Sequence, residues 1–124
     1  MLVCYTDGGY KQSRSPKGYG SFAIYKDNNL IALEHFDLFK SNTSNESEYL
    51  SLLALLEFLE KNYKDETSFI YMDSRLVYNQ VGNGWKVRAD NLKEFNAVAL
   101  KIKNKINVKL IWIGRKEILK VLGH

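Results

Sequence analysis

The stretch MLVCYTDGGY, residues 1–10, joins a strand pattern to a residue that strands avoid. Alternation in residues 1–6 predicts a β-strand, and Asp7 follows although aspartate is depleted in strands. Gly8 and Gly9 come next, and glycine permits turns and close backbone approach. Two interpretations of Asp7 stay open: a turn residue ahead of the glycines, or a carboxylate placed there for chemistry.

Outward from this stretch, the pattern moves from strands to alternating helices and strands. Residues 18–27 and 30–39 are two expected strands, and Asn28 and Asn29 between them are a hairpin signal. A meander followed by alternating elements predicts an α/β fold with a mixed sheet and helices packed on it. The other expected elements are a helix at 41–62, a strand at 67–73, a short helix at 74–82, a loop at 82–90, a helix at 91–105, a strand at 108–113 and a short helix at 114–124.

The helix at 41–62 has two possible starts and one apolar face. Asn45 with Glu48 forms one candidate capping box, and Thr43 with Glu46 forms the other. Spacings of four, three and four residues place on one face the residues Glu48, Leu52, Leu55 and Leu59. Glu48 therefore heads an inward face, either as a helix cap or as a functional carboxylate.

Length and composition predict one domain, residues 1–124, with a basic second half. Residues 1–62 contain 6 Lys or Arg and 8 Asp or Glu, whereas residues 63–124 contain 12 and 6. This asymmetry favours a polyanionic partner held near acidic groups, with a solvated basic surface as the alternative. The single cysteine, Cys4, suits a reducing compartment, so a cytoplasmic location is expected. No apolar run approaches the roughly 20 residues of a membrane span, so no membrane partner is expected.

Three carboxylates occupy positions that structure alone does not require. Asp7 lies at the first strand, Glu48 heads the inward helix face, and Asp73 ends a buried strand. Asp73 has a structural alternative, because Asp73 and Ser74 together could begin the helix at 74–82. Clustered carboxylates repel one another unless cations neutralise them. Oxygen ligands select Mg²⁺ or Mn²⁺, and two such ions about 4 Å apart can activate water and stabilise a leaving oxygen.

The order of six motifs resembles the ribonuclease H family, type 1, over nearly the whole chain. The motifs are Y-T-D-G-G at 5–9, a glycine-aromatic hairpin at 18–25, T-S-N-E-S-E-Y-L at 43–50, M-D-S at 72–74, G-W-K-V at 84–87 before N-L at 91–92, and a late strand with Trp112. The compact fifth motif looks like members that lack the extra basic protrusion. The resemblance implies a five-stranded mixed sheet, three strands antiparallel and then two parallel, with helices on both faces.

The same resemblance implies an activity, a partner and a set of site residues. Members of the family hydrolyse the RNA strand of RNA–DNA hybrids with two Mg²⁺ or Mn²⁺ ions, leaving 5′-phosphate and 3′-hydroxyl ends. They read the 2′-hydroxyls of the RNA rather than its bases. The ligands carried over are Asp7, Glu48 and Asp73. The expected nucleic-acid contacts are Gly8, Gly9, Asn45, Ser74, Arg75, Lys86 and Arg88, although a solvated surface is the alternative for the lysines. A monomer is expected, with a dimer left open.

The chain departs from the family pattern most seriously at its end. Leu122 stands where the family has a fourth carboxylate, and Ile118 stands where it has an asparagine. His124, or its terminal carboxylate, is the expected catalytic and metal-ligating substitute, and Glu117 is a less favourable one because of helix geometry. Milder departures are Ser44 in place of asparagine and Arg75 in place of glutamine.

Three functions therefore follow from the sequence. The first is a metal-dependent ribonuclease that acts on RNA–DNA hybrids. The second is a family-like module that binds nucleic acid but has lost turnover with its fourth ligand. The third is a nuclease of the same fold that acts on DNA, although the complete series of motifs from residue 5 to residue 74 favours the ribonuclease.

Overall fold

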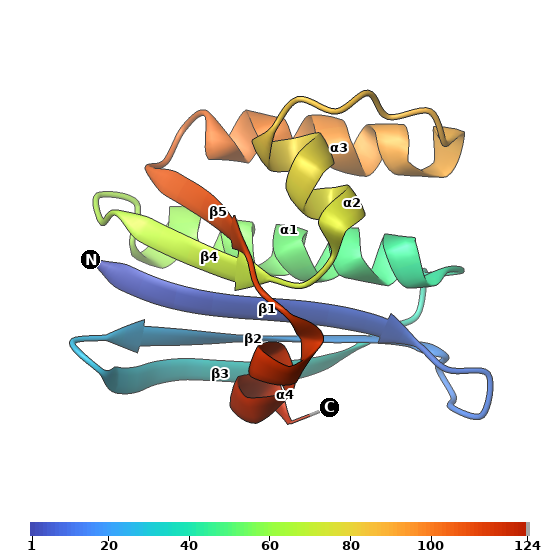
Figure 1. The fold of residues 1–124 in the computed structure, drawn as a ribbon, viewed down its shortest axis with the longest axis horizontal. Helices are drawn as coiled ribbons and strands as arrows, with labels where there is room; N and C mark the ends of the chain where they lie inside the picture. The colour runs from blue at the N-terminus through green and yellow to red at the C-terminus, as the bar shows by residue number, and fades with distance from the viewer. Residues whose placement is uncertain (124) are drawn as a thin grey trace.

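The computed structural model describes residues 1–123 and shows a five-stranded sheet between two helical layers (Figure 1). The strands are β1 (Leu2–Tyr10), β2 (Gly18–Lys26), β3 (Asn29–Leu38), β4 (Ser68–Met72) and β5 (Val108–Trp112). The helices are α1 (Ser44–Asn62), α2 (Arg75–Val77), the π-helical turn η1 (Tyr78–Gly82), α3 (Asp90–Lys103) and α4 (Arg115–Leu122). The predicted order of elements is confirmed, and most boundaries differ by one to three residues.

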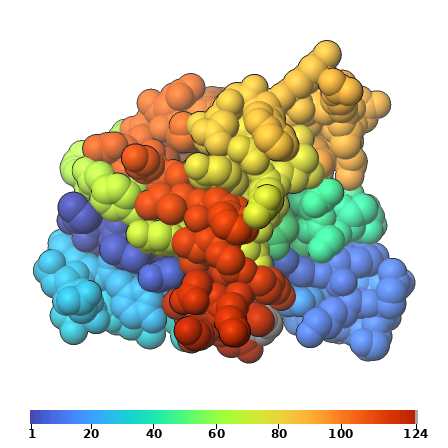
Figure 2. All heavy atoms as spheres, viewed as in Figure 1, coloured from blue at the N-terminus to red at the C-terminus, as the bar shows by residue number. Residues whose placement is uncertain are grey.

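The sheet has the strand order β3-β2-β1-β4-β5. β1 pairs antiparallel with β2 and parallel with β4, and β5 continues the parallel side. α1 and α3 cover one face, and α4 lies alone on the other (Figure 1). On that second face, the red α4 separates the cyan β2–β3 hairpin from the blue loop at residues 11–17 (Figure 2). The predicted mixed sheet with helices on both faces is therefore confirmed.

Two apolar clusters hold the helices on the sheet. Leu52, Leu55 and Leu59 form the inward face of α1 and are buried in the larger cluster, as their spacing predicts. A smaller cluster joins Ile118 and Leu122 of α4 to Ala23 of β2. Within residues 1–123, no helix is both long and apolar enough to cross a membrane.

The start of α1 distinguishes the two candidate capping boxes. The Thr43 hydroxyl accepts a hydrogen bond from the backbone N–H of Glu46 at 3.1 Å, so Thr43 is the N-cap. The Asn45–Glu48 alternative is wrong, because both residues already lie inside the helix. The Glu48 side chain turns instead toward β1, where its Oε1 accepts the backbone N–H of Gly8.

Candidate active site

Parallel pairing brings Asp7 and Asp73 together at the same end of neighbouring strands. β1 and β4 pair in register from Leu2↔Ser68 to Tyr5↔Tyr71, and the same register extended by two residues aligns Asp7 with Asp73. β1 continues to Tyr10, so Asp7 is inside the strand and only 1% exposed. The turn interpretation of Asp7 is therefore wrong.

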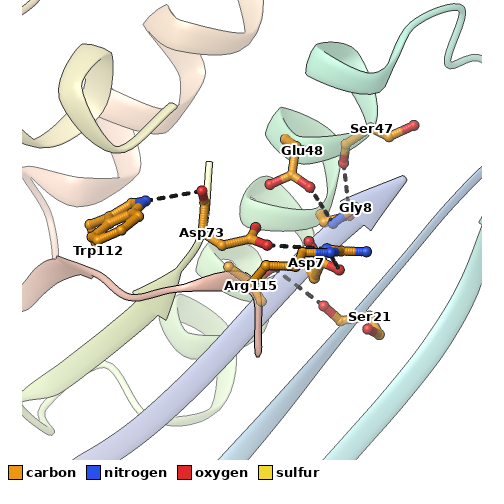
Figure 3. Close-up of polar contacts among 10 residues, drawn as sticks. Asp7, Gly8, Ser21, Ser47, Glu48, Asp73, Trp112 and Arg115 are labelled. Carbon is orange, nitrogen blue, oxygen red and sulfur yellow. Dashed lines mark hydrogen bonds and ion pairs between the residues drawn. The ribbon is translucent and has the colours of Figure 1, made fainter. Parts of the chain in front are cut away.

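Gly8 allows the third carboxylate to join this pair. A Cβ at Gly8 would lie 2.2 Å from the carbonyl oxygen of Ser47, so only glycine lets α1 approach β1 this closely. The Gly8 N–H then donates to Glu48 Oε1 at 2.9 Å and directs this carboxylate toward Asp7 (Figure 3). Gly9 is also buried, and the Tyr19 ring fills the space beside it. Both glycines thus have packing roles, and their contact with nucleic acid stays a prediction.

Asp7, Glu48 and Asp73 form one cluster, in which a carboxylate oxygen from each residue lies within 4.8 Å of the other two. Burial, reinforced by Asp7, raises the pKa of Glu48 to about 10. Burial and the nearby Asp7 also raise the pKa of Asp73, and Arg115 partly opposes this rise. These shifts are those expected of carboxylates that are buried close to one another.

The donor set suits a hard divalent cation. All three residues offer carboxylate oxygens, which Mg²⁺ and Mn²⁺ prefer. The three residues come from β1, α1 and the position directly after β4, so the fold brings these ligands together from separate parts of the chain. A bound cation would reduce the electrostatic repulsion among the three carboxylates, and this would favour its binding.

Arg115 is the contact that the sequence-based prediction missed. Its Nη1 donates to Asp7 Oδ2 at 2.7 Å and to Asp73 Oδ2 at 3.1 Å (Figure 3). Arg115 is the first residue of α4, three residues after the end of β5, and its side chain is 52% exposed. The available signal was a cation at the end of the strand that neighbours Asp73 on the sheet.

The end of the chain supplies no described fourth carboxylate to this cluster. Leu122 is 4% exposed and Ile118 is completely buried, so both family-pattern positions belong to the apolar contact with β2. Glu117 is exposed and pairs with Lys120 at 3.7 Å. His124, the substitute predicted from the sequence, lies outside the described residues.

The residues predicted to contact nucleic acid have different surroundings in the structure. Ser74 caps α2 by accepting the Val77 N–H at 3.2 Å, so the helix cap belongs to Ser74 rather than Asp73. Arg75 stacks over Trp112, with its guanidinium carbon 4.4 Å from the ring centroid. The Trp112 indole N–H in turn donates to the carbonyl oxygen of Asp73 at 3.0 Å. Exposed positions are occupied by Asn45, Lys86 and Arg88.

The RNase H family model matches residues 1–121. The chain belongs to the RNase H family. RNase H relatives in sequence include the bifunctional protein Rv2228c of Mycobacterium tuberculosis, 28% identical over 115 residues, which are 92% of this chain and 31% of that protein. A ribonuclease H of Desulforamulus reducens is 31% identical over 84 residues, which are 68% of this chain and 49% of that protein. The chain thus spans less than half the length of either relative.

Solved RNase H structures share the fold. RNase H1 of Halobacterium salinarum NRC-1 is 18% identical, with a TM-score of 0.84 over 98% of this chain and 92% of that one. LC11-RNase H1, in complex with an RNA/DNA hybrid, is 24% identical, with a TM-score of 0.83 over 97% of this chain and 90% of that one. These likenesses confirm the RNase H fold that the motif order predicted.

Proposed function

We propose that this chain is a divalent-metal-dependent endonuclease that hydrolyses the RNA strand of RNA–DNA hybrids. The observation that carries the proposal is the convergence of Asp7, Glu48 and Asp73 within 4.8 Å in a member of the RNase H family. A solved structure of similar fold, LC11-RNase H1, is a complex with such a hybrid. The proposed products are 5′-phosphate and 3′-hydroxyl ends.

In this proposal, the three carboxylates hold two Mg²⁺ or Mn²⁺ ions. Bound ions of this kind activate the attacking water and stabilise the leaving oxygen of a phosphodiester. Asp7 is the central ligand, because it is the most buried and lies between the other two in the sheet and helix packing. Glu48 is oriented by the Gly8 N–H, and Asp73 is anchored through its carbonyl by Trp112. His124 remains the proposed substitute for the fourth ligand.

Binding of the hybrid is proposed to involve polar groups on the surface around the cluster. Exposed Lys86 and Arg88 on the segment before α3 can neutralise phosphates. Asn45, in the first turn of α1, and Arg75, at the start of α2, lie near two of the carboxylates in sequence and can read sugar or phosphate groups. Ser74 has a hydroxyl beside Asp73, and its oxygen already accepts a backbone N–H. Gly8 and Gly9 remain proposed close contacts.

The proposal also covers the setting of the protein. One domain at 1–124, a monomeric state and a cytoplasmic location are proposed together. The buried Cys4, whose burial raises the pKa of its thiol to about 12, fits a protein that does not rely on disulfide bonds.

A second candidate function is an RNase H-like module that binds nucleic acid without cutting it. The specific observation in its favour is the buried, apolar Leu122 at the position of the fourth carboxylate. Such a module would retain the fold, the basic surface and the three remaining acids while turning over slowly or not at all.

The test is cleavage of an end-labelled RNA–DNA hybrid by the purified chain in Mg²⁺, in Mn²⁺ and in EDTA, beside a binding measurement on the same hybrid. The nuclease predicts cleavage of the RNA strand with either ion and none in EDTA. Binding without cleavage in every condition would contradict it and support the second candidate. Duplex DNA of the same sequence is the control for the DNA nuclease.

A further inference from the structure

Arg115 places a fixed positive charge on two of the three carboxylates. One nitrogen, Nη1, bridges the buried Asp7 at 2.7 Å and Asp73 at 3.1 Å. An arginine guanidinium stays charged in proteins, so it cannot yield by losing its proton. Arg115 therefore keeps its charge while it contacts carboxylate oxygens that a metal ion would also use.

The packing of α4 explains why Arg115 points at the cluster. Residues 115, 118 and 122 are spaced by three and four, and they share one helical face. Ile118 and Leu122 bury that face against Ala23 of β2. Arg115 lies in the first turn of α4, where its side chain reaches Asp7 within β1 and Asp73 after β4. Ile118 and Leu122, which stand where the family pattern has polar residues, thus also orient α4 so that Arg115 faces the cluster.

Charge counting gives this arrangement a consequence for metal binding. When a bound cation keeps all three carboxylates ionised, they and the guanidinium together carry a net charge of −2, which one divalent ion balances. A second divalent ion would bring excess positive charge, and the guanidinium would add to that excess as long as it stays in contact. Mg²⁺ sits about 2.1 Å from its ligand oxygens, so an ion on Asp7 Oδ2 would lie close to Nη1 and be repelled by it.

We propose that Arg115 competes with divalent cations for Asp7 and Asp73, and so limits how tightly the site binds its ions before substrate arrives. This inference rests on the metal site of the proposed function. The side chain is half exposed, so it has solvent to move into when an ion or a substrate phosphate replaces its contacts. Arg115 then acts as a regulator of ion affinity rather than as a ligand.

The test measures Mn²⁺ binding to the full chain by titration calorimetry, after chelator treatment and without nucleic acid. Arg115→Gln removes the charge and keeps a polar side chain. We expect it to lower the Kd for Mn²⁺ on the order of tenfold at low salt. Lys116→Gln is the matched control, because Lys116 is the next residue of the same helix and is exposed. Its Kd should change by less than about twofold.

Thermal unfolding in EDTA gives an independent readout. Arg115→Gln should lower the Tm of the metal-free protein, because Asp7 and Asp73 lose their counter-charge, and Mn²⁺ should raise the Tm of this variant more than that of wild type. Arg115→Lys, which keeps the charge without the planar fork, should bind Mn²⁺ with intermediate affinity. Arg115→Lys also provides the comparison with wild type if Arg115→Gln folds poorly.

The outcomes separate this inference from the proposed function. Equal or weaker Mn²⁺ binding by Arg115→Gln, relative to wild type, overturns the competition and leaves the nuclease in place. A failure of wild type and all variants to bind Mn²⁺ removes the metal site itself, and with it both proposals.

Discussion

Asp7 is a charged residue inside a buried strand, and its neighbours explain how the fold tolerates it. Its Oδ2 accepts a charge-assisted hydrogen bond from Arg115. Burial, together with the charge of Asp7, raises the pKa values of the neighbouring Glu48 and Asp73. At the residue scale, the carboxylates of the cluster repel one another, and an added cation would reduce that repulsion.

Glu48 provides a prediction about pH. Its pKa is raised to about 10 in the folded state, against an ordinary value of 4.5. The folded state then holds a proton that the unfolded state releases, so the free energy of unfolding falls as pH rises from about 4.5 toward 10. Glu48→Gln mimics the protonated form and keeps an oxygen for the Gly8 N–H.

The measurement is denaturant unfolding of both proteins in EDTA at pH 5 and pH 8.5. We expect Glu48→Gln to be more stable than wild type by at least about 1 kcal/mol at the higher pH, and by much less at the lower pH. A difference that does not change with pH would contradict the raised pKa. Glu57→Gln, an exposed residue of the same helix, is the control.

The sequence predicted the three carboxylates because each has a local signal. Asp7 breaks a strand pattern, Asp73 ends a strand, and Glu48 heads an apolar helix face. The signal for Arg115 is weaker, since a basic residue shortly after a strand is ordinary. Its role depends on how α4 crosses the sheet, and that crossing is a tertiary property that no local pattern encodes.

At the scale of elements, the start of α1 combines a cap with a close approach to β1. Thr43 caps the N-terminus of α1, which places Glu48 just over one turn inside the helix. Gly8 leaves room for the backbone at Ser47. The sequence offered two capping boxes with equal spacing. The structure distinguishes them, because Thr43 caps the helix and the Glu48 side chain instead accepts a hydrogen bond from the Gly8 N–H.

The cap gives a prediction about stability. Thr43→Ala should lower the free energy of unfolding by about 1 kcal/mol, because the Glu46 N–H loses its acceptor. Asn45→Ala, at the rejected cap position, should change it by less than about 0.5 kcal/mol. Chemical denaturation of the two variants beside wild type measures both values. A larger loss at Asn45 than at Thr43 would contradict the observed cap.

The apolar face of α4 gives a second prediction at this scale. Leu122→Asp places a carboxylate at the family's fourth position, but Leu122 is buried against β2. We expect a loss of about 2–4 kcal/mol in unfolding free energy and no gain in hybrid cleavage. Leu119→Asp, on the exposed side of the same helix, should cost less than about 1 kcal/mol. Increased cleavage by Leu122→Asp would show that the position faces the cluster.

At the scale of the whole molecule, topology and charge act together. The β1–β4 parallel pair delivers two carboxylates to one end of the sheet, and the basic second half of the chain provides Lys86 and Arg88. The strand order was predictable from the motif order, because it resembled a known family. The side on which α4 packs was not predictable from periodicity alone.

Charge distribution predicts the salt dependence of binding. The affinity for an RNA–DNA hybrid should fall steeply with salt, and replacing Lys86 and Arg88 by alanine should reduce the log–log slope by about 1 to 2. Lys64→Ala is the control, because Lys64 is an exposed residue in the turn before β4, at the opposite end of that strand from Asp73. Fluorescence anisotropy in EDTA measures all three proteins. Equal slopes would place the hybrid elsewhere on the surface.

The central claim is that the carboxylate cluster cuts RNA in hybrids. Its most direct test compares Asp7→Asn with Asp90→Asn, a substitution of the same kind at an exposed residue of α3, on an end-labelled hybrid with saturating Mn²⁺. The account predicts that Asp7→Asn folds, binds the hybrid and loses at least about 100-fold in cleavage rate, whereas Asp90→Asn cleaves like wild type and leaves 5′-phosphate ends. Cleavage by Asp7→Asn at the wild-type rate would contradict the account.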